Sequence, residues 1–131
     1  MINFKKKIKM AWIDAEMLLR KKTRVNTRLD LQRQFKIVIA IPPYRCKNYA
    51  NEEGFRIQVG QNSFINIPIS MLKKVYQATS KNGFVYNRAI FLALYPNELS
   101  NKPCYVHAIG KLFSNAGVMV QITRYSYQII I

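Results

Sequence analysis

Apolar residues recur at helical spacing in two segments near the C-terminus, with a break rich in prolines and capping residues between them. In the first segment, Ala89, Ile90, Ala93 and Leu94 share one face of a helix. Pro96 ends that segment, because proline lacks a backbone N–H and clashes with the preceding turn. The pattern predicts a short helix over about 89–94 that buries these four side chains.

A second helix is predicted to begin near Pro103 and to end before Gly117. Serine and asparagine stand just ahead of Pro103 and are good capping residues, and Gly117 supplies the left-handed residue that closes a helix. Its buried stripe is predicted to consist of Val106, Ile109 and Phe113. Its outer side is predicted to carry Tyr105, Ala108, Lys111 and Asn115.

Further elements flank these two helices. Residues 71–80 have a helical pattern, with Ser70 as a plausible N-cap and Lys73 and Lys74 pointing outward. The inner face of that helix is predicted to consist of Leu72, Val75, Tyr76 and Thr79. At the C-terminus, residues 118–122 and 127–131 predict a β-hairpin whose tip carries Arg124 and Tyr125.

The order of these elements over residues 69–131 resembles that of a winged helix-turn-helix. The resemblance implies that the second motif helix enters a DNA major groove, and that the hairpin lies near the backbone or the minor groove. It rests on element order alone, so no family residues are carried over. Two amphipathic helices and a strand are also ordinary parts of a hydrophobic core, which is the alternative interpretation.

The N-terminal segment predicts a helix of about five turns. Its apolar stripe is Phe4, Ile8, Ala11, Trp12, Ala15, Leu18 and Leu19. Four lysines lie mostly off the stripe: Lys5, Lys6, Lys7 and Lys9. Such a helix can lie on a membrane surface or dock on the domain. We expect docking, because the rest of the chain offers apolar faces to receive it.

The densest basic run, residues 20–28, holds five Lys or Arg and no acidic residue. Cations suit a helix C-terminus, because the helix dipole is negative there. Five are more than the dipole requires, so we expect the run to form a helix end and a phosphate-contacting loop.

The middle of the chain predicts a small antiparallel sheet of about three strands. Residues 35–41 are apolar and β-branched and end at two prolines, which is typical of a central or well-covered strand. Residues 55–59 and 63–67 alternate in polarity around a turn and predict a hairpin.

The net charge restricts the class of function more strongly than any sequence motif does. The chain has 21 Lys and Arg against 6 Asp and Glu, which gives a net charge of +15. A folded domain this basic repels itself, and polyphosphate partners are the usual reason for such a charge. Acidic residues would serve solubility better. These numbers favour nucleic-acid binding.

Length and composition restrict the other classes of protein to which the sequence could belong. The 131 residues, half of them hydrophobic, suit one domain with a core. No apolar run approaches the roughly 20 residues of a membrane span, and the N-terminus has no signal-peptide pattern. Two cysteines form no disulfide framework, so a reducing, cytoplasmic location is expected.

Few residues suit catalysis or metal binding. His107, the single histidine, lies on the flank of the second motif helix that also carries Lys111, and it stands one turn after Cys104. Zinc needs three or four ligands, and of the usual types only Cys46 remains. The acidic residues are too scattered for a two-metal nuclease, and the five glycines form no phosphate loop. We predict no metal, no cofactor and no small-molecule substrate.

One enzymatic alternative stays open. Small basic ribonucleases of the toxin kind cleave RNA with Tyr, Lys, Arg and sometimes one His, and they need no metal because the 2′-hydroxyl is the internal nucleophile. Eight tyrosines, many cations and His107 fit that composition, but no motif fixes an active site. A concave cluster of Tyr, His and Arg would favour this ribonuclease. One contiguous positive face that includes the second motif helix would favour binding.

The sequence therefore predicts a single α+β domain. Residues 1–68 would form a helix and antiparallel strands, and residues 69–131 a winged-helix-like unit. We expect a nucleic-acid-binding protein with duplex DNA as its main ligand, not an enzyme and not a membrane protein, with a homodimer left open. Phosphate contacts are predicted at Lys21, Lys22, Arg24, Arg28, Lys73 and Lys74. Groove or wing contacts are predicted at Tyr105, His107, Lys111, Asn115 and Arg124.

Overall fold

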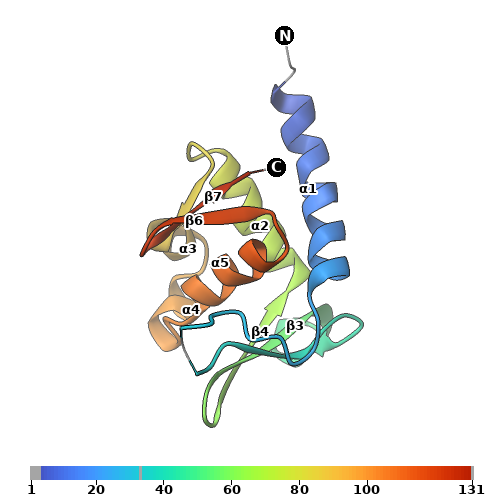
Figure 1. The fold of residues 1–131 in the computed structure, drawn as a ribbon, viewed down its shortest axis with the longest axis vertical. Helices are drawn as coiled ribbons and strands as arrows, with labels where there is room; N and C mark the ends of the chain where they lie inside the picture. The colour runs from blue at the N-terminus through green and yellow to red at the C-terminus, as the bar shows by residue number, and fades with distance from the viewer. Residues whose placement is uncertain (1–3, 33, 131) are drawn as a thin grey trace.

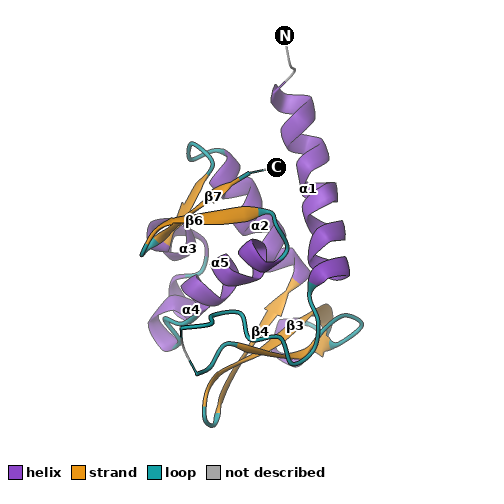
Figure 2. Cartoon of the chain, viewed as in Figure 1, coloured by secondary structure: helices purple, strands orange, loops and turns teal. Residues whose placement is uncertain are grey.

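The computed structural model describes residues 4–32 and 34–130, with side chains from Trp12 onward (Figure 1). The described residues form a mixed α+β structure with five α-helices and two small antiparallel sheets (Figure 2). The helices are α1 (Phe4–Lys22), α2 (Ile69–Ser80), α3 (Arg88–Leu94), α4 (Pro96–Asn101) and α5 (Tyr105–Asn115). The strands are β1 (Ile37–Ala40), β2 (Arg45–Cys46), β3 (Glu52–Gly60), β4 (Ser63–Pro68), β5 (Val85–Asn87), β6 (Met119–Thr123) and β7 (Ser126–Ile129). None of these helices has the length and apolar character that crossing a membrane requires.

Helix α1 runs along one side of the molecule and packs against α2 and α5 (Figure 1). Trp12, Ala15 and Leu19 are buried, which confirms the predicted docking of this helix within the described side chains. The predicted stripe residues Phe4, Ile8 and Ala11 lie outside the described side chains, as do Lys5, Lys6, Lys7 and Lys9.

The first sheet is built around β3, which pairs with β4 on one side and with β1 and β2 on the other. The predicted β3–β4 hairpin is confirmed, with Phe55 opposite Ile67 and Ile57 opposite Ile65. The sheet has four strands, and β1 lies at its edge, not at its centre. Residues 26–29 cover that edge, because Asn26 N donates to the Val38 carbonyl at 2.7 Å.

Helix α2 buries its predicted inner face, and Met71 joins it. The predicted N-cap is wrong. Pro68 occupies the cap position, and the Ser70 hydroxyl donates instead to Glu52 Oε2 at 3.0 Å. Lys73 and Lys74 are exposed, as expected.

The segment before α5 differs most from the prediction. Helix α3 buries Phe91, whereas Ala89 and Ala93 are exposed, so the predicted inner face is wrong for these two alanines. The break after Pro96 contains a further short helix, α4, which buries Leu99. Strand β5, which precedes α3, pairs with β7 in the second sheet, whose strand order is β5–β7–β6.

Helix α5 is followed by Gly117, whose positive φ of 77° confirms the predicted helix end. Val106, Ile109 and Phe113 are buried as predicted. Strands β6 and β7 then form the predicted hairpin. Strand β6 lies at the edge of its sheet, and Val120 and Ile122 are 45% and 47% exposed there.

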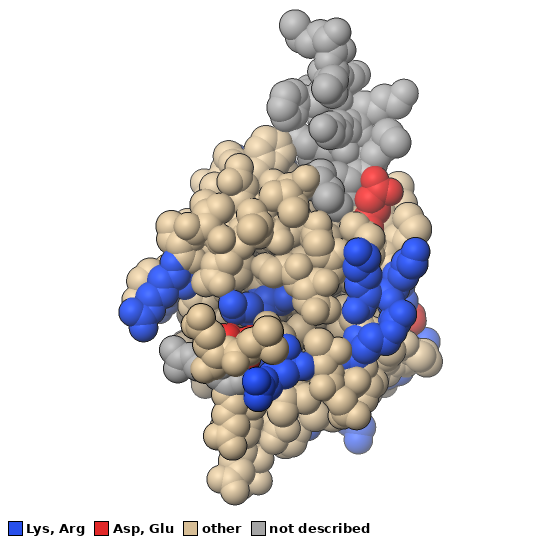
Figure 3. All heavy atoms as spheres, viewed as in Figure 1, with Lys and Arg blue, Asp and Glu red and all other residues tan. Residues whose placement is uncertain are grey.

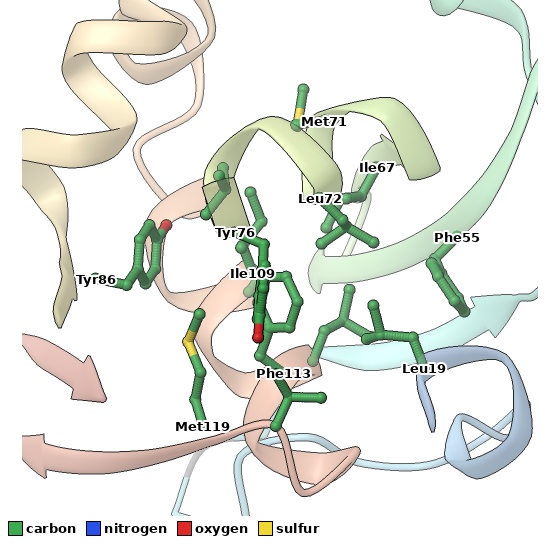
Figure 4. Close-up of a cluster of buried hydrophobic side chains, with 14 of the residues drawn as sticks. Leu19, Phe55, Ile67, Met71, Leu72, Tyr76, Tyr86, Ile109, Phe113 and Met119 are labelled. Atoms are coloured by element: carbon green, nitrogen blue, oxygen red, sulfur yellow. The ribbon is translucent and has the colours of Figure 1, made fainter. Parts of the chain in front are cut away.

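One hydrophobic cluster joins the elements on both sides of residue 68. Figure 4 shows Leu19 of α1, Phe55 of β3 and Phe113 of α5 among its members. The ring of Tyr76 on α2 packs between two other aromatic rings, with its centroid 5.7 Å from that of Trp12 and 6.0 Å from that of Phe113. Helix α5 is therefore held in place from several sides, and this core sets the position of its remaining face.

Candidate functional site

A hollow of about 730 Å³ lies between α5, the β6–β7 hairpin and the segment that leads into β1. Its lining includes three basic side chains, those of Lys36, Lys111 and Arg124, and one acidic side chain, that of Asp30. His107 and Tyr125 also line it, together with polar groups of Gln32, Gln121 and Thr123. A small polyanion or one segment of a nucleic-acid strand suits a concave site of this size and charge.

Helix α5 supplies one wall. Because its apolar side chains face α1, α4 and the second sheet, the narrow face left over carries His107 and, one turn later, Lys111. The Lys111 ammonium donates to Gln121 Oε1 on β6 at 2.8 Å. This bond holds the lysine between the helix and the hairpin, at the rim of the hollow.

The hairpin supplies the second wall, and its own hydrogen bonds order its tip. Thr123 Oγ1 lies 2.6 Å from Ser126 Oγ and accepts from the Tyr125 N–H at 3.1 Å. The Arg124 guanidinium lies over the Tyr125 ring, 5.7 Å from its centroid, which is a cation–π distance. Both side chains are exposed, so they remain accessible to a ligand.

The segment before β1 supplies the third wall. Its backbone is anchored on both sides, since Leu29 N donates to the Lys36 carbonyl at 2.8 Å and Lys36 N donates to the Gln58 carbonyl at 2.8 Å. Asp30 Oδ1 accepts from the Gln32 N–H at 3.1 Å, which forms a local turn. Lys36 therefore lines the hollow from a different segment of the chain than Lys111.

His107 is oriented by a buried tyrosine. Its Nδ1 lies 3.0 Å from the Tyr127 hydroxyl, and Tyr127 is fully buried on the central strand of the second sheet. Burial, and secondarily the negative charge of Asp30, raise the pKa of Tyr127 to about 12. The phenol therefore stays protonated at neutral pH and keeps its hydrogen bond to the imidazole.

Basic side chains also gather outside the hollow. Figure 3 shows Lys and Arg spread over this face of the molecule, with few acidic side chains among them. The last turn of α1 contributes Arg20, Lys21 and Lys22, and Arg24 follows with its guanidinium bonded to the Lys21 carbonyl. Asn115 Nδ2 donates to the Lys22 carbonyl at 3.5 Å, which places the end of α5 beside the end of α1.

The structure brings some of the predicted contact residues together and separates others. His107, Lys111 and Arg124 meet in the hollow. Lys21, Lys22, Arg24 and Asn115 are exposed where α1 and α5 end. Arg28 is exposed and donates to the Leu31 carbonyl at 3.4 Å, whereas Lys73 and Lys74 lie on α2 and do not line the hollow.

The prediction that Tyr105 and Ala108 lie on the outer side of α5 is wrong. Ala108 is fully buried, and Tyr105 is 6% exposed. The Tyr105 hydroxyl donates to the Asn66 carbonyl at 2.9 Å and lies 3.1 Å from the Tyr49 hydroxyl. Tyr105 therefore ties α5 to the first sheet and cannot reach a ligand from that position.

The cysteines do not build a metal site within the described residues, where no three His, Cys, Asp or Glu side chains are close enough to hold an ion. Cys46 is buried, and burial raises the pKa of its thiol to about 11. It is therefore a protonated core residue at neutral pH. Cys104 is half-buried and is absent from the lining of the hollow.

Sequence reasoning missed Lys36 and the polar residues that surround it in the hollow. No local pattern could have found them, because their place depends on pairing between segments distant in sequence. Comparison with protein-family models, with curated proteins and with solved structures gave no match.

Proposed function

We propose that this protein binds nucleic acid, that duplex DNA is its principal ligand, and that the basic hollow holds a segment of one strand. The observation that carries the proposal is the convergence of Lys36, Lys111 and Arg124, from three different segments, on one concave site. Cations gathered at one site attract the nucleic-acid polyanion, because each phosphate that is neutralised releases counterions. The net charge of +15 supports the same class of ligand.

The order of elements supports duplex DNA. From α2 onward the chain runs α2, β5, α3, α4, α5, β6 and β7. This order is compatible with a winged helix-turn-helix in which α5 is the recognition helix and the β6–β7 hairpin is the wing. On this proposal Lys111 donates to guanine, Asn115 pairs with adenine, and Arg124 contacts the backbone or the minor groove.

The basic residues where α1 ends would extend this surface. Lys21, Lys22 and Arg24 lie next to the exposed end of α5, through the contact between Asn115 and the Lys22 carbonyl. Such cations contact phosphates, which position a protein on DNA but carry no sequence information. Their proposed role is therefore general affinity, and that of Lys111 and Asn115 is specificity.

The test is a titration of labelled duplex DNA, single-stranded DNA and RNA, measured by fluorescence anisotropy over a salt series. Each neutralised phosphate contributes a log–log slope of roughly −0.9, and we expect about −5 or steeper on duplex DNA. Lys81→Ala, which removes an exposed lysine at the end of α2, is the matched control and should leave the slope unchanged. An affinity that stays flat between low and moderate salt would refute the proposal.

Variants separate the two roles. Lys111→Ala combined with Asn115→Ala should cost about 1–3 kcal/mol for each lost base contact on the preferred sequence and leave non-specific binding largely intact. The triple change of Lys21, Lys22 and Arg24 to alanine should weaken binding to all sequences about equally and make the slope shallower. The reverse pattern would show that the roles are assigned wrongly.

A further inference from the structure

We propose that the hollow receives an unpaired nucleotide of the bound DNA, with its base stacked on Tyr125 and its phosphates held by Lys36 and Arg124. The preferred ligand is then a duplex that continues into a single-stranded tail. This unpaired-nucleotide site rests on the proposed function, since it specifies which part of the DNA enters the hollow and what the hollow recognises there.

The first support is an exposed aromatic ring in the lining of the hollow. Tyr125 belongs to that lining and is 64% exposed. An exposed aromatic side chain beside cations is a stacking platform for a base, and every base can use it because every base has a π-face. Inside a duplex both faces of each base are covered by its neighbours. The ring therefore suits a base that has left the stack.

The second support is that this platform is ordered by the hairpin itself. The Tyr125 N–H donates to Thr123 Oγ1 at 3.1 Å, and the Arg124 guanidinium lies 5.7 Å from the centroid of the Tyr125 ring. On the side of α5, the ring centroid of His107 lies 6.4 Å from that of Tyr125. A ring that is already positioned loses little conformational freedom when a base stacks on it, which favours binding.

The third support is the mixture of charges in the lining. Lys36 and Arg124 suit phosphates, whereas Asp30 repels them. Asp30 Oδ1 accepts from the Gln32 N–H at 3.1 Å, and a carboxylate has about four lone-pair sites, so it can accept further hydrogen bonds. A phosphodiester carries acceptors only, but bases carry N–H donors, and pairing occupies most of these donors in a duplex. A hollow with both kinds of group suits a whole unpaired nucleotide better than a bare phosphate.

The size of the hollow agrees with this ligand. Its volume of about 730 Å³ is that of a site for a small organic molecule, which fits a nucleotide and excludes a whole duplex. Moving a base out of a duplex costs unstacking and unpairing energy, and the cost is least where the base is already single-stranded. A duplex with a single-stranded tail therefore fills the site at a lower cost than a blunt duplex does.

The first test compares ligands by fluorescence anisotropy, using the full chain. The ligands are a duplex with a short unpaired tail and a blunt duplex with the same number of phosphates. We expect the tail to raise affinity by about 5–150-fold, the range that corresponds to one base–aromatic contact. Tyr125→Ala should remove this preference and leave binding of the blunt duplex largely intact. Tyr125→Trp is the matched control, because it keeps an aromatic ring, and it should keep the preference.

The second test locates the base by photo-crosslinking. A 5-iodouracil is placed at each position of the tail in turn, or at an internal paired position as the control. Irradiation joins it to an aromatic side chain that stacks on it, and mass spectrometry of the peptides identifies that residue. We expect a crosslink to Tyr125 from the tail and none to Tyr125 from the paired position.

The possible failures are distinguishable, and circular dichroism melts show that each variant is folded. Equal affinity for the two ligands, a tail preference that persists in Tyr125→Ala, or crosslinks from the tail to other residues alone would each overturn the unpaired-nucleotide site and leave the duplex proposal in place. Binding of single strands that depends on Tyr125, without measurable binding of blunt duplex, would overturn duplex DNA as the principal ligand and support the unpaired-nucleotide site. An affinity for every ligand that is flat with salt would overturn the proposed function itself.

Discussion

Gly110, in the middle of α5, provides a test of how closely this helix packs against Tyr127 of the second sheet. A Cβ at this position would lie 2.3 Å from Cε1 and 2.5 Å from Cζ of Tyr127, far inside van der Waals contact. Tyr127 cannot swing away, because it is fully buried on the central strand of its sheet and its ring centroid lies 6.0 Å from that of Tyr86. Gly110→Ala therefore forces two packed elements apart.

Two opposing contributions set the size of the effect. Replacing a glycine inside a helix by alanine is favourable by about 1 kcal/mol from helix propensity alone. Overpacking a filled core costs typically about 1–3 kcal/mol, and here the displaced ring is the one that orients His107. We expect net destabilisation of about 1–2 kcal/mol, with the sign decided by packing and not by propensity.

Urea denaturation, followed by circular dichroism and by the fluorescence of Trp12, measures this change. Gly60→Ala is the matched control, because its Cβ would meet only Ser63 Cβ at 3.2 Å beside a hairpin turn. In a Tyr127→Val background, which removes the obstructing ring, the change at Gly110 should become neutral or favourable. A Gly110→Ala variant of the wild type that is as stable as its parent, or more stable, would refute the reasoning.

Three other predictions concern stability. Burial is the main cause that raises a tyrosine pKa to about 12 at three positions, Tyr76, Tyr95 and Tyr127. Because unfolded tyrosine titrates near 10, their contribution should be complete below about pH 10 and be lost as the pH rises through about 12, seen as a falling urea midpoint. Trp12→Ala should cost about 3–5 kcal/mol in urea unfolding, and an unchanged midpoint would show that α1 is not part of the core. Tyr105→Phe removes the hydroxyl that bonds the Asn66 carbonyl and should cost about 1–3 kcal/mol, whereas Tyr125→Phe at the exposed hairpin tip should cost little.

Local patterns in the sequence predicted the elements that bury a continuous face. Helix α2 and the β3–β4 hairpin have such faces, and both were found. Helix α4 was missed because six residues with one large apolar side chain, Leu99, leave no periodic pattern. The buried face of α3 was wrong for a related reason, since a seven-residue helix makes two turns and Phe91 alone is fully buried.

The candidate site shows what periodicity leaves out. The apolar stripe of α5 predicted which side of the helix faces the core, but not how wide an arc of the helix surface is buried. Because α1, α4 and the second sheet all contact this helix, the arc extends to Tyr105 and Ala108. Lys36 is held beside the hollow in part by its backbone bond to Gln58, a contact between distant residues that no short window of sequence contains.

The two sheet edges described above differ in a way that matters for handling the protein. Residues 26–29 cover the edge at β1, whereas β6 pairs only with β7 in the described part of the chain and exposes Val120 and Ile122. An uncovered apolar edge is a template for pairing with another chain, and here the mutual repulsion of copies carrying +15 opposes it. The Debye length falls from about 10 Å at 0.1 M salt to about 3 Å at 1 M. A concentrated salt wash that strips bound polyanions from the protein would therefore also remove its protection against aggregation.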